Sequence, residues 1–198
     1  MAADLDRIVG NLLAFYDFSG RVVISVGAGG GQLVEYGRKA RKVVAIDSDA
    51  AALQRLGQIL EQRDLAPKFE LICQDFSVAR ARGDVVLFEF SLHEMDDPSI
   101  ALRQSRSMAP DTVVFDHLPG SDWAYYVAEE EKVQRSWNAV ASMPVRSRIQ
   151  HDAVQRFASY EELREKVRPQ GRVSLDRVQR FSGAAEIIIP MKYGIALL

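Results

Sequence analysis

The chain has 198 residues, of which 47% are hydrophobic, and its formal net charge is −2 at pH 7. This length and composition suffice for one domain with a full hydrophobic core, so we expect a single domain over residues 1–198. The small net charge excludes a uniformly basic surface of the kind that grips nucleic acid. The single cysteine, Cys73, excludes a disulfide framework and a cysteine zinc site within one chain.

The N-terminal segment "MAADLDRIVGNLLAFYDF" contains acidic residues and apolar residues at helical spacing. This pattern predicts a helix and differs from the basic head and apolar core of a signal peptide. No apolar run in the sequence is long enough to span a bilayer. We therefore expect a cytoplasmic, reducing location with no membrane contact.

Four glycines in five positions follow an apolar run in "VVISVGAGGGQLVEYG", residues 22–37. The run predicts a buried strand, and Leu33 and Val34 predict a helix after the glycines. Glycine permits left-handed backbone angles and lets a ligand approach the main chain, while the first N–H groups of the helix point toward the gap. The pattern favours a nucleotide-like ligand, with a purely structural turn as the alternative.

The glycine spacing distinguishes between two classes of nucleotide loop. Gly27, Gly29 and Gly31 give G-x-G-x-G, whereas the dinucleotide fingerprint G-x-G-x-x-G requires glycine at the position of Gln32.

A second predicted strand, "KVVAIDSD" at residues 42–49, places Asp47 twenty positions after Gly27. A carboxylate at this distance and at a strand tip can accept hydrogen bonds from both ribose hydroxyls, with Asp49 as the fallback. The alternative is that Asp47 caps the helix predicted by the leucine spacing that follows.

Further strands are predicted at residues 69–76, 84–95 and 111–117. Near the C-terminus, "GRVSLDRVQRF" and "AEIIIPMKYGIALL" predict a closing hairpin whose last strand is antiparallel to an otherwise parallel sheet.

The glycine spacing, Asp47 and the closing hairpin together resemble the class I S-adenosylmethionine-dependent methyltransferases. The resemblance covers residues 10–198 and is strongest over 22–117. It implies an α/β fold with a single doubly wound, seven-stranded sheet of order 3-2-1-4-5-7-6, helices on both faces, and an antiparallel last strand. It also implies S-adenosyl-L-methionine as cofactor and S-adenosyl-L-homocysteine as product.

The resemblance implies a set of cofactor-binding positions along the strand tips. Asp75 would meet the adenine amino group and Phe76 would lie against the adenine ring, with a core aromatic as the alternative for Phe76. The whole set is Gly27, Ala28, Gly29, Gly31, Asp47, Ser48, Asp75, Phe76 and Glu89.

The chain departs from the family pattern two places before the first glycine, where Ser25 replaces the usual acidic residue. Glu89 lies near the tip of the strand expected beside it and could face the cofactor's ammonium group instead. Alternation along the strand leaves open the possibility that Glu89 points to the other side of the sheet.

Methyl transfer requires a nucleophile held in line behind the sulfonium methyl group, and a general base is optional. The candidate bases are His93, Glu94 and His117, which follow two predicted strands. The alternative for His93 and Glu94 is the start of a helix, and for His117 a strand-end histidine bonded to backbone.

Residues 119–168 form the predicted helical excursion that would select the acceptor and act as a lid. Trp123, Tyr125 and Tyr126 are its candidate substrate contacts, with packing of the helix on the sheet as the alternative. A cluster of arginines over residues 146–156 is more typical of a solvated face.

The sequence therefore predicts methyl transfer to a small molecule, without a metal site, membrane contact or nucleic-acid partner. The alternatives are an RNA or protein methyltransferase and a non-catalytic cofactor-binding protein on the same fold. The oligomeric state stays open and includes a homodimer among the options.

Overall fold

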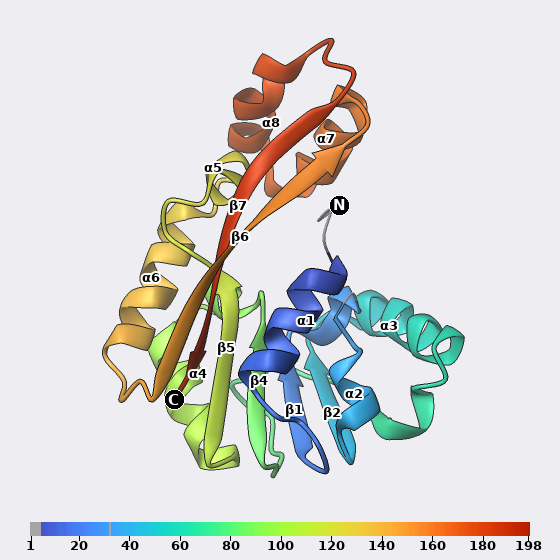
Figure 1. Ribbon diagram of the computed structural model, residues 1–198, viewed down its shortest axis with the longest axis vertical. Helices are drawn as coiled ribbons and strands as arrows, with labels where there is room; N and C mark the ends of the chain where they lie inside the picture. Colours follow the sequence, from blue (N-terminus) through green and yellow to red (C-terminus); the bar gives the residue numbers. More distant parts are fainter. Residues whose placement is uncertain (1–4, 32) are drawn as a thin grey trace.

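The computed structural model describes residues 5–31 and 33–198. Its strands form one seven-stranded sheet of order β3-β2-β1-β4-β5-β7-β6 (Figure 1). The strands are β1 Val22–Val26, β2 Lys42–Asp47, β3 Phe69–Cys73, β4 Val85–Glu89, β5 Asp111–His117, β6 Ser147–Phe157 and β7 Ile187–Leu197. The predicted strand order and fold class are confirmed.

The first five strands are parallel, whereas β7 runs antiparallel to both β5 and β6. The central strands are apolar on both faces because helices cover the sheet on each side. In β1, for example, Val23 packs toward one core and Ile24 toward the other.

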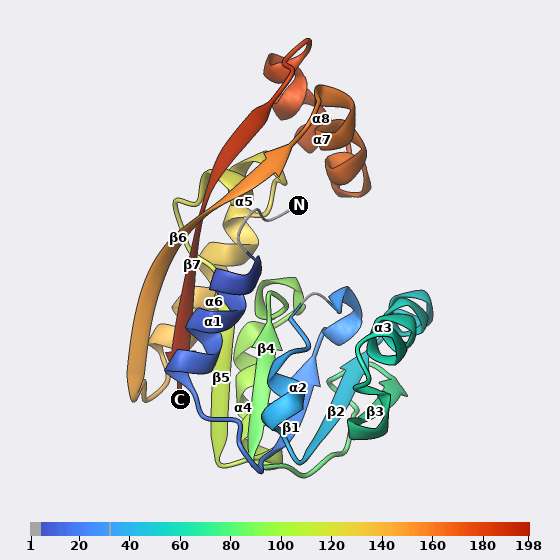
Figure 2. The same ribbon diagram turned by 45° about the vertical axis from the view of Figure 1, so that its right-hand side comes forward.

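Helices α1, α2 and α3 lie on one face of the sheet, and α4 and α6 lie on the other (Figures 1 and 2). The helices are α1 Leu5–Phe15, α2 Tyr36–Lys39, α3 Ala50–Gln62, α4 Pro98–Met108, α5 Asp122–Tyr126, α6 Glu130–Ala141, α7 Tyr160–Val167 and α8 Arg172–Val178. The 3-10 turns are η1 Ala28–Gly30, η2 Ala66–Lys68, η3 Leu92–Glu94, η4 Arg168–Gln170 and η5 Gln179–Phe181. Among these described helices, none has the length and apolar character needed to cross a bilayer.

The closing hairpin is present, but its first strand was predicted in the wrong place. Residues 171–181 form α8 and η5, and the partner of β7 is β6, inside the segment expected to be a helical excursion. Ser174 and Val178 are buried four residues apart, which is helical spacing, whereas Val173 is exposed. In β6, the alternation of Ala153, Gln155 and Phe157 toward the core was hidden because Gln155 is polar and the apolar Val154 lies between two core positions.

Two predicted helices are shorter than expected. The helix after the glycines begins only at Tyr36, and Leu33 and Val34 are buried in irregular chain before it. The excursion helix is broken into α5 and α6 at Ala128, whose φ is +57°.

The β6–β7 hairpin extends past the rest of the sheet and carries α7 and α8 at its far end (Figure 1). Residues 193–197 of β7 pair with both β5 and β6, whereas residues 187–192 pair with β6 alone. Within the paired part, Gly194 faces the Trp137 ring of α6 so closely that a Cβ there would lie 2.8 Å from it.

Gly194→Ala should lower the free energy of unfolding by about 1 to 3 kcal/mol, because the added methyl group overpacks a filled contact. The Trp137 ring cannot easily retreat, since its indole N–H donates to the His117 carbonyl. The matched control is Gly10→Ala in α1, where a Cβ would meet no atom within 4 Å. That variant should gain up to about 1 kcal/mol of helix stability. Urea denaturation of both variants measures the difference, and equal stability would show that the ring can move.

Candidate active site

A cavity of about 520 Å³ lies at the carboxyl ends of the parallel strands. Ligands of doubly wound sheets bind at this edge. Its walls come from the residues after β1, β2, β3 and β4 and from the first turns of α4. The described lining residues are Val26, Gly27, Ile46, Asp47, Ser48, Gln74, Asp75, Phe76, Ser77, Phe90, Ser91, Glu94, Met95, Asp96, Asp97, Ile100, Ala101 and Gln104.

The backbone of the glycine loop lies close to the neighbouring segments at this edge of the sheet. Gly27 has φ of +70° and lies so near Ser91 that a Cβ would come within 2.4 Å of the serine Cβ. Gly29 and Gly31 instead face α3, where a Cβ on Gly29 would lie 2.3 Å from that of Ala52. Of the described loop residues predicted to bind cofactor, Gly27 lines the cavity, while Ala28 packs in the α3 core.

Asp47 lines the cavity and also fixes the glycine loop. One carboxylate oxygen accepts the Gly29 N–H at 2.9 Å, and the other accepts the Asp49 N–H at 2.9 Å. The helix cap of α3 is Asp49, whose side chain accepts the Ala51 N–H at 2.8 Å. The capping alternative for Asp47 is therefore wrong. A carboxylate has about four acceptor positions, so acceptor capacity remains for ribose hydroxyls.

Ser48, Asp75 and Phe76, which the family resemblance assigned to cofactor binding, also line the cavity. Hydrogen bonds from Ser77 lower the pKa of the Asp75 carboxyl, which keeps it ionised as an acceptor. Phe76 lies edge-on to Phe88 with ring centres 5.5 Å apart, so it belongs to the core and to the cavity wall at once. The core interpretation of Phe76 is therefore confirmed, and its contact with an adenine ring stays a prediction.

Glu89 lies outside the described cavity lining, on the α1 and α2 face of the sheet. There it interacts with the hydroxyl of buried Tyr36, which also contacts Ser25. Ser25 and Glu89 thus lie on the same face of the sheet, as they must if Glu89 replaces the acidic residue missing at position 25. This face is opposite to the one that bears Phe76 and Phe88. Burial raises the pKa of the Glu89 carboxyl to about 8, although its hydrogen bond with Tyr36 acts in the lowering direction.

His93 lies at the centre of a polar cluster with buried Asp116 and Glu129 and exposed Glu94. Its Nδ1 is 2.6 Å from Asp116, and its Nε2 is 3.3 Å from Glu94 and 3.5 Å from Glu129. Burial lowers the pKa of His93, but the charge and hydrogen bond of Asp116 outweigh it and raise the pKa to about 12. The raised pKa favours the protonated imidazole and disfavours His93 as the general base, a role that stays a prediction from the sequence.

Sequence reasoning missed Asp116 and Glu129. Asp116 is fully buried near the end of β5, and Glu129 is brought to His93 by the left-handed turn at Ala128 before α6. The signal for Asp116 was a carboxylate inside the apolar run "VVFDH", the same kind of signal that drew attention to Glu89.

His117 is buried beside Phe90, with ring centres 4.6 Å apart, and is paired with Tyr193 across the β5–β7 ladder. Burial lowers its pKa to about 4, so it is neutral near pH 7. Its ring centre is 5.6 Å from that of His93, which places both predicted histidines at the same edge of the sheet.

The three predicted substrate residues of α5 lie outside the described cavity lining. Trp123 is buried and stacks on Phe157 at 5.7 Å, and Tyr126 packs on Phe181 at 5.2 Å. Tyr125 is half exposed and lies under the guanidinium of Arg177. These contacts pack α5 against the β6–β7 hairpin and the α8 region. They agree with the alternative that this helix packs on the sheet.

The family follows from a match over most of the sequence. Residues 1–175 match the family model described as a methyltransferase domain. The chain belongs to this methyltransferase domain family. The resemblance noted in the sequence is confirmed, and the expected enzyme class and S-adenosylmethionine cofactor are those of the family.

Solved structures share the fold at low sequence identity. A protein of Bacillus halodurans C-125 assigned as a methyltransferase has 13% identity and a TM-score of 0.69 over 96% of each chain. An S-adenosylmethionine-dependent methyltransferase of Aquifex aeolicus has 16% identity and a TM-score of 0.59, covering 98% of this chain and 88% of that one.

The 4+2 cyclase SpnF has 14% identity and a TM-score of 0.61, covering 97% of this chain and 80% of that one. No curated protein matches the sequence. Since the fold also supports a cyclase, the reaction has to be argued from the site.

Glu89→Gln should flatten the pH dependence of stability between pH 4.5 and 8. The folded protein keeps the Glu89 proton up to about pH 8, whereas the unfolded chain releases it near 4.5. The free energy of unfolding of the parent therefore falls as pH rises through this window, and the amide has no proton to lose.

Urea denaturation at pH 5 and pH 8 measures this effect. The free energy of unfolding of Glu89→Gln minus that of the parent should be larger at pH 8 than at pH 5. The exposed α3 variant Glu61→Gln serves as the control for changing a surface carboxylate. Parallel losses in the parent and Glu89→Gln would mean that the carboxyl is ionised throughout.

Proposed function

We propose that the chain transfers a methyl group from S-adenosyl-L-methionine to a small-molecule acceptor. The observation that carries this proposal is the cavity where Asp47, Asp75 and Phe76 converge at the strand ends. A carboxylate beside the β2 tip suits a ribose, and an ionised carboxylate next to an aromatic ring suits an adenine. A volume of about 520 Å³ lies in the range typical of small-molecule sites.

The side chains present fit this cofactor. Asp47 would accept the ribose hydroxyls, Asp75 the adenine amino group, and Phe76 would pack on the adenine ring. Gly27 keeps the loop close to Ser91, because any Cβ there would displace the serine. The cofactor supplies an electrophilic methyl group, so the protein's task is to orient the acceptor and exclude water.

Proton transfer, where the acceptor needs it, is disfavoured at His93, whose raised pKa favours the protonated imidazole. His117 is the neutral imidazole of the pair and has an Nδ1 that can accept a proton. Its burial makes it a weak base.

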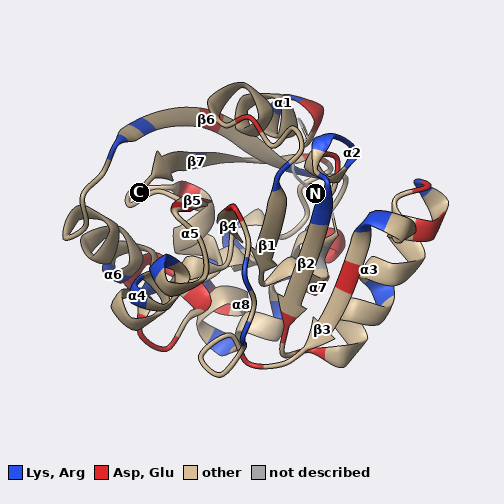
Figure 3. Ribbon diagram, turned by 90° about the horizontal axis from the view of Figure 1, so that it is seen from below, with Lys and Arg blue, Asp and Glu red and all other residues tan. Residues whose placement is uncertain are grey.

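A small acceptor is favoured over RNA by the state of the arginine cluster on β6. Arg146 pairs with Asp111 at 2.7 Å, Arg148 lies over the Trp137 ring, and Arg156 is 3.5 Å from Glu186. These guanidinium groups are engaged with the protein itself. Figure 3 shows acidic and basic residues interspersed over the elements, a distribution that differs from the basic stripe of a nucleic-acid surface.

Asp47→Ala should weaken S-adenosyl-L-homocysteine binding about 10- to 100-fold, the loss expected for hydrogen bonds to a charged group. Isothermal titration calorimetry measures the affinity. The matched control is Asp49→Ala, two residues away, which removes the α3 cap without touching the cavity. It should lose about 1 kcal/mol of stability and keep the parent's affinity.

Equal affinity losses in both variants would mean that the α3 cap, and not the Asp47 carboxylate, controls the site. If the parent protein binds S-adenosyl-L-homocysteine but methylates no phenol, amine or carboxylic acid in a broad screen, the non-catalytic alternative replaces the enzyme.

A further inference from the structure

Three side chains with metal-binding atoms converge beside the cavity. They are His93 and Glu94 in η3 and Glu129 just before α6, and one ligand atom from each lies within 4.8 Å of the others. Glu129 is 35 residues after Glu94 in the sequence, so no short spacing motif marks these three residues as a group.

The distances suit a cation with short nitrogen and oxygen bonds. Ligand atoms about 2.1 Å from a tetrahedral ion lie about 3.4 Å from one another. The Nε2 of His93 is 3.3 Å from a Glu94 oxygen and 3.5 Å from a Glu129 oxygen. Both carboxylates thus lie at a suitable distance from Nε2, and the ligand atoms of the three side chains all lie within 4.8 Å of one another.

The other ring nitrogen of His93 is held as it is in many metal sites. Nδ1 lies 2.6 Å from the buried Asp116 carboxylate, which also accepts the His93 backbone N–H at 3.0 Å. Carboxylates in this position orient a ligating imidazole and leave Nε2 toward the metal. The imidazole is almost fully buried, with 3% of its side chain exposed, so its direction is fixed by the fold.

Charge also favours a divalent ion. Asp116, Glu94 and Glu129 are three carboxylates, and Lys132, 2.6 Å from Glu94, is the neighbouring cation. With the imidazole neutral, these groups carry two net negative charges, which one divalent cation neutralises.

We infer that His93, Glu94 and Glu129 form a binding site for a divalent cation, with Asp116 as the positioning residue behind the imidazole. One imidazole and two carboxylates suit Zn²⁺ or Mn²⁺ better than a soft or a purely oxygen-bound ion. Three protein ligands leave at least one coordination position open, as in catalytic rather than structural zinc sites.

The site borders the cavity because Glu94 lines it. A cation there could bind an oxygen atom of the acceptor at its open position. This role rests on the proposed function, whereas the binding of the cation rests on the side chains alone.

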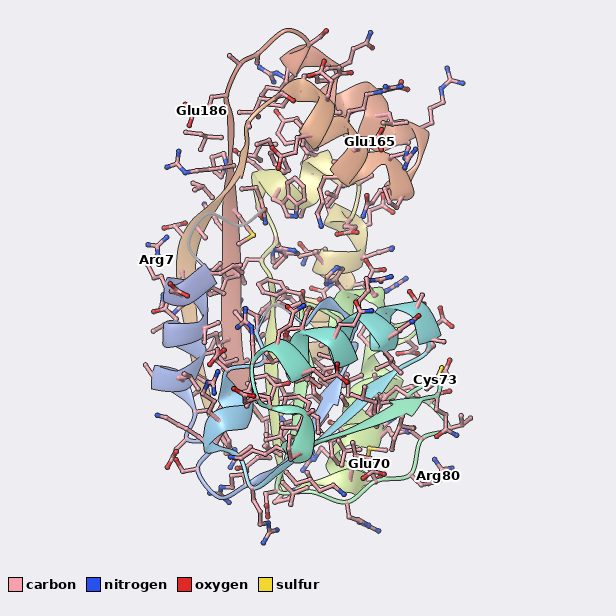
Figure 4. The ribbon with its side chains drawn as sticks, turned by 90° about the vertical axis from the view of Figure 1, so that its right-hand side faces the viewer. Arg7, Glu70, Cys73, Arg80, Glu165 and Glu186 are labelled. Carbon is pink, nitrogen blue, oxygen red and sulfur yellow. The ribbon has the colours of Figure 1, made fainter. Side chains whose placement is uncertain are left out.

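The test is titration of the chelator-treated protein with Zn²⁺, Mn²⁺ and Co²⁺ by calorimetry, with the visible absorption of Co²⁺ as a second readout. A Cys73→Ser background removes a competing ligand, since Cys73 is exposed on the edge strand β3 (Figure 4). We expect one equivalent of Zn²⁺ or Mn²⁺ to bind. Glu129→Gln should weaken binding at least about tenfold, because it replaces an anionic ligand while leaving His93 and Asp116 paired.

Glu130→Gln is the matched control, since the adjacent residue pairs with Arg177 and lies outside the cluster. It should bind the cation as the parent does. Failure of a folded parent protein to bind Zn²⁺ or Mn²⁺, or equal affinities in Glu129→Gln and the parent, would overturn the site.

S-adenosyl-L-homocysteine affinity, measured on the same samples, separates this proposal from the proposed function. If the protein binds the cofactor but no cation, only the proposed metal site is wrong. If it binds the cation but not the cofactor, the proposed methyltransferase function is wrong and the metal site stands.

Discussion

The buried carboxylate of Asp116 joins the segments that build the functional edge. It accepts the His93 backbone N–H at 3.0 Å, the His93 Nδ1 at 2.6 Å and the His117 backbone N–H at 2.8 Å. A fully buried carboxylate without such partners would cost several kcal/mol. The end of β5 and the turn after β4 must therefore stay together for the fold to be stable, and this requirement fixes His93.

The turn after β4 is held at two further points, and it forms one wall of the cavity. The Phe90 N–H donates to the Phe115 carbonyl at 2.7 Å, and the Ser91 hydroxyl donates to the Val26 carbonyl at 2.6 Å. Phe90 has φ of +50°, a conformation that these flanking bonds impose on a bulky residue. Since Gly27 meets Ser91 directly, the glycine loop and this turn are positioned by each other.

The sheet separates two polar groups that the sequence placed near each other. The His93 cluster and the cavity lie toward α4 and α6, whereas Glu89, Tyr36 and Ser25 lie toward α1 and α2. Glu89 with its raised pKa is a neutral hydrogen-bond donor near pH 7 and differs in this from the acidic residue usual at the position of Ser25. The methionine end of the cofactor would thus meet a different electrostatic environment from that of most family members.

The sequence alone determined the fold class and half of the candidate site. Parallel strands buried on both faces need continuous apolar runs, so β1, β2, β4 and β5 could be located from local composition. The glycine loop and Asp47 follow such runs directly, and strand ends at one edge of a sheet must meet. The cavity wall formed by the strand tips was therefore predictable without knowledge of any long-range contact.

Only the tertiary structure decided the remainder. Alternation identifies β6 only when its partner β7 is known, because a strand with a polar core residue, Gln155, and an exposed first half resembles a solvated segment. Whether Glu89 faces the cavity depends on which face each helix covers. The cluster of His93, Asp116 and Glu129 joins three separate elements, and its hydrogen bonds and charges exist only after β4, β5 and α6 have packed together.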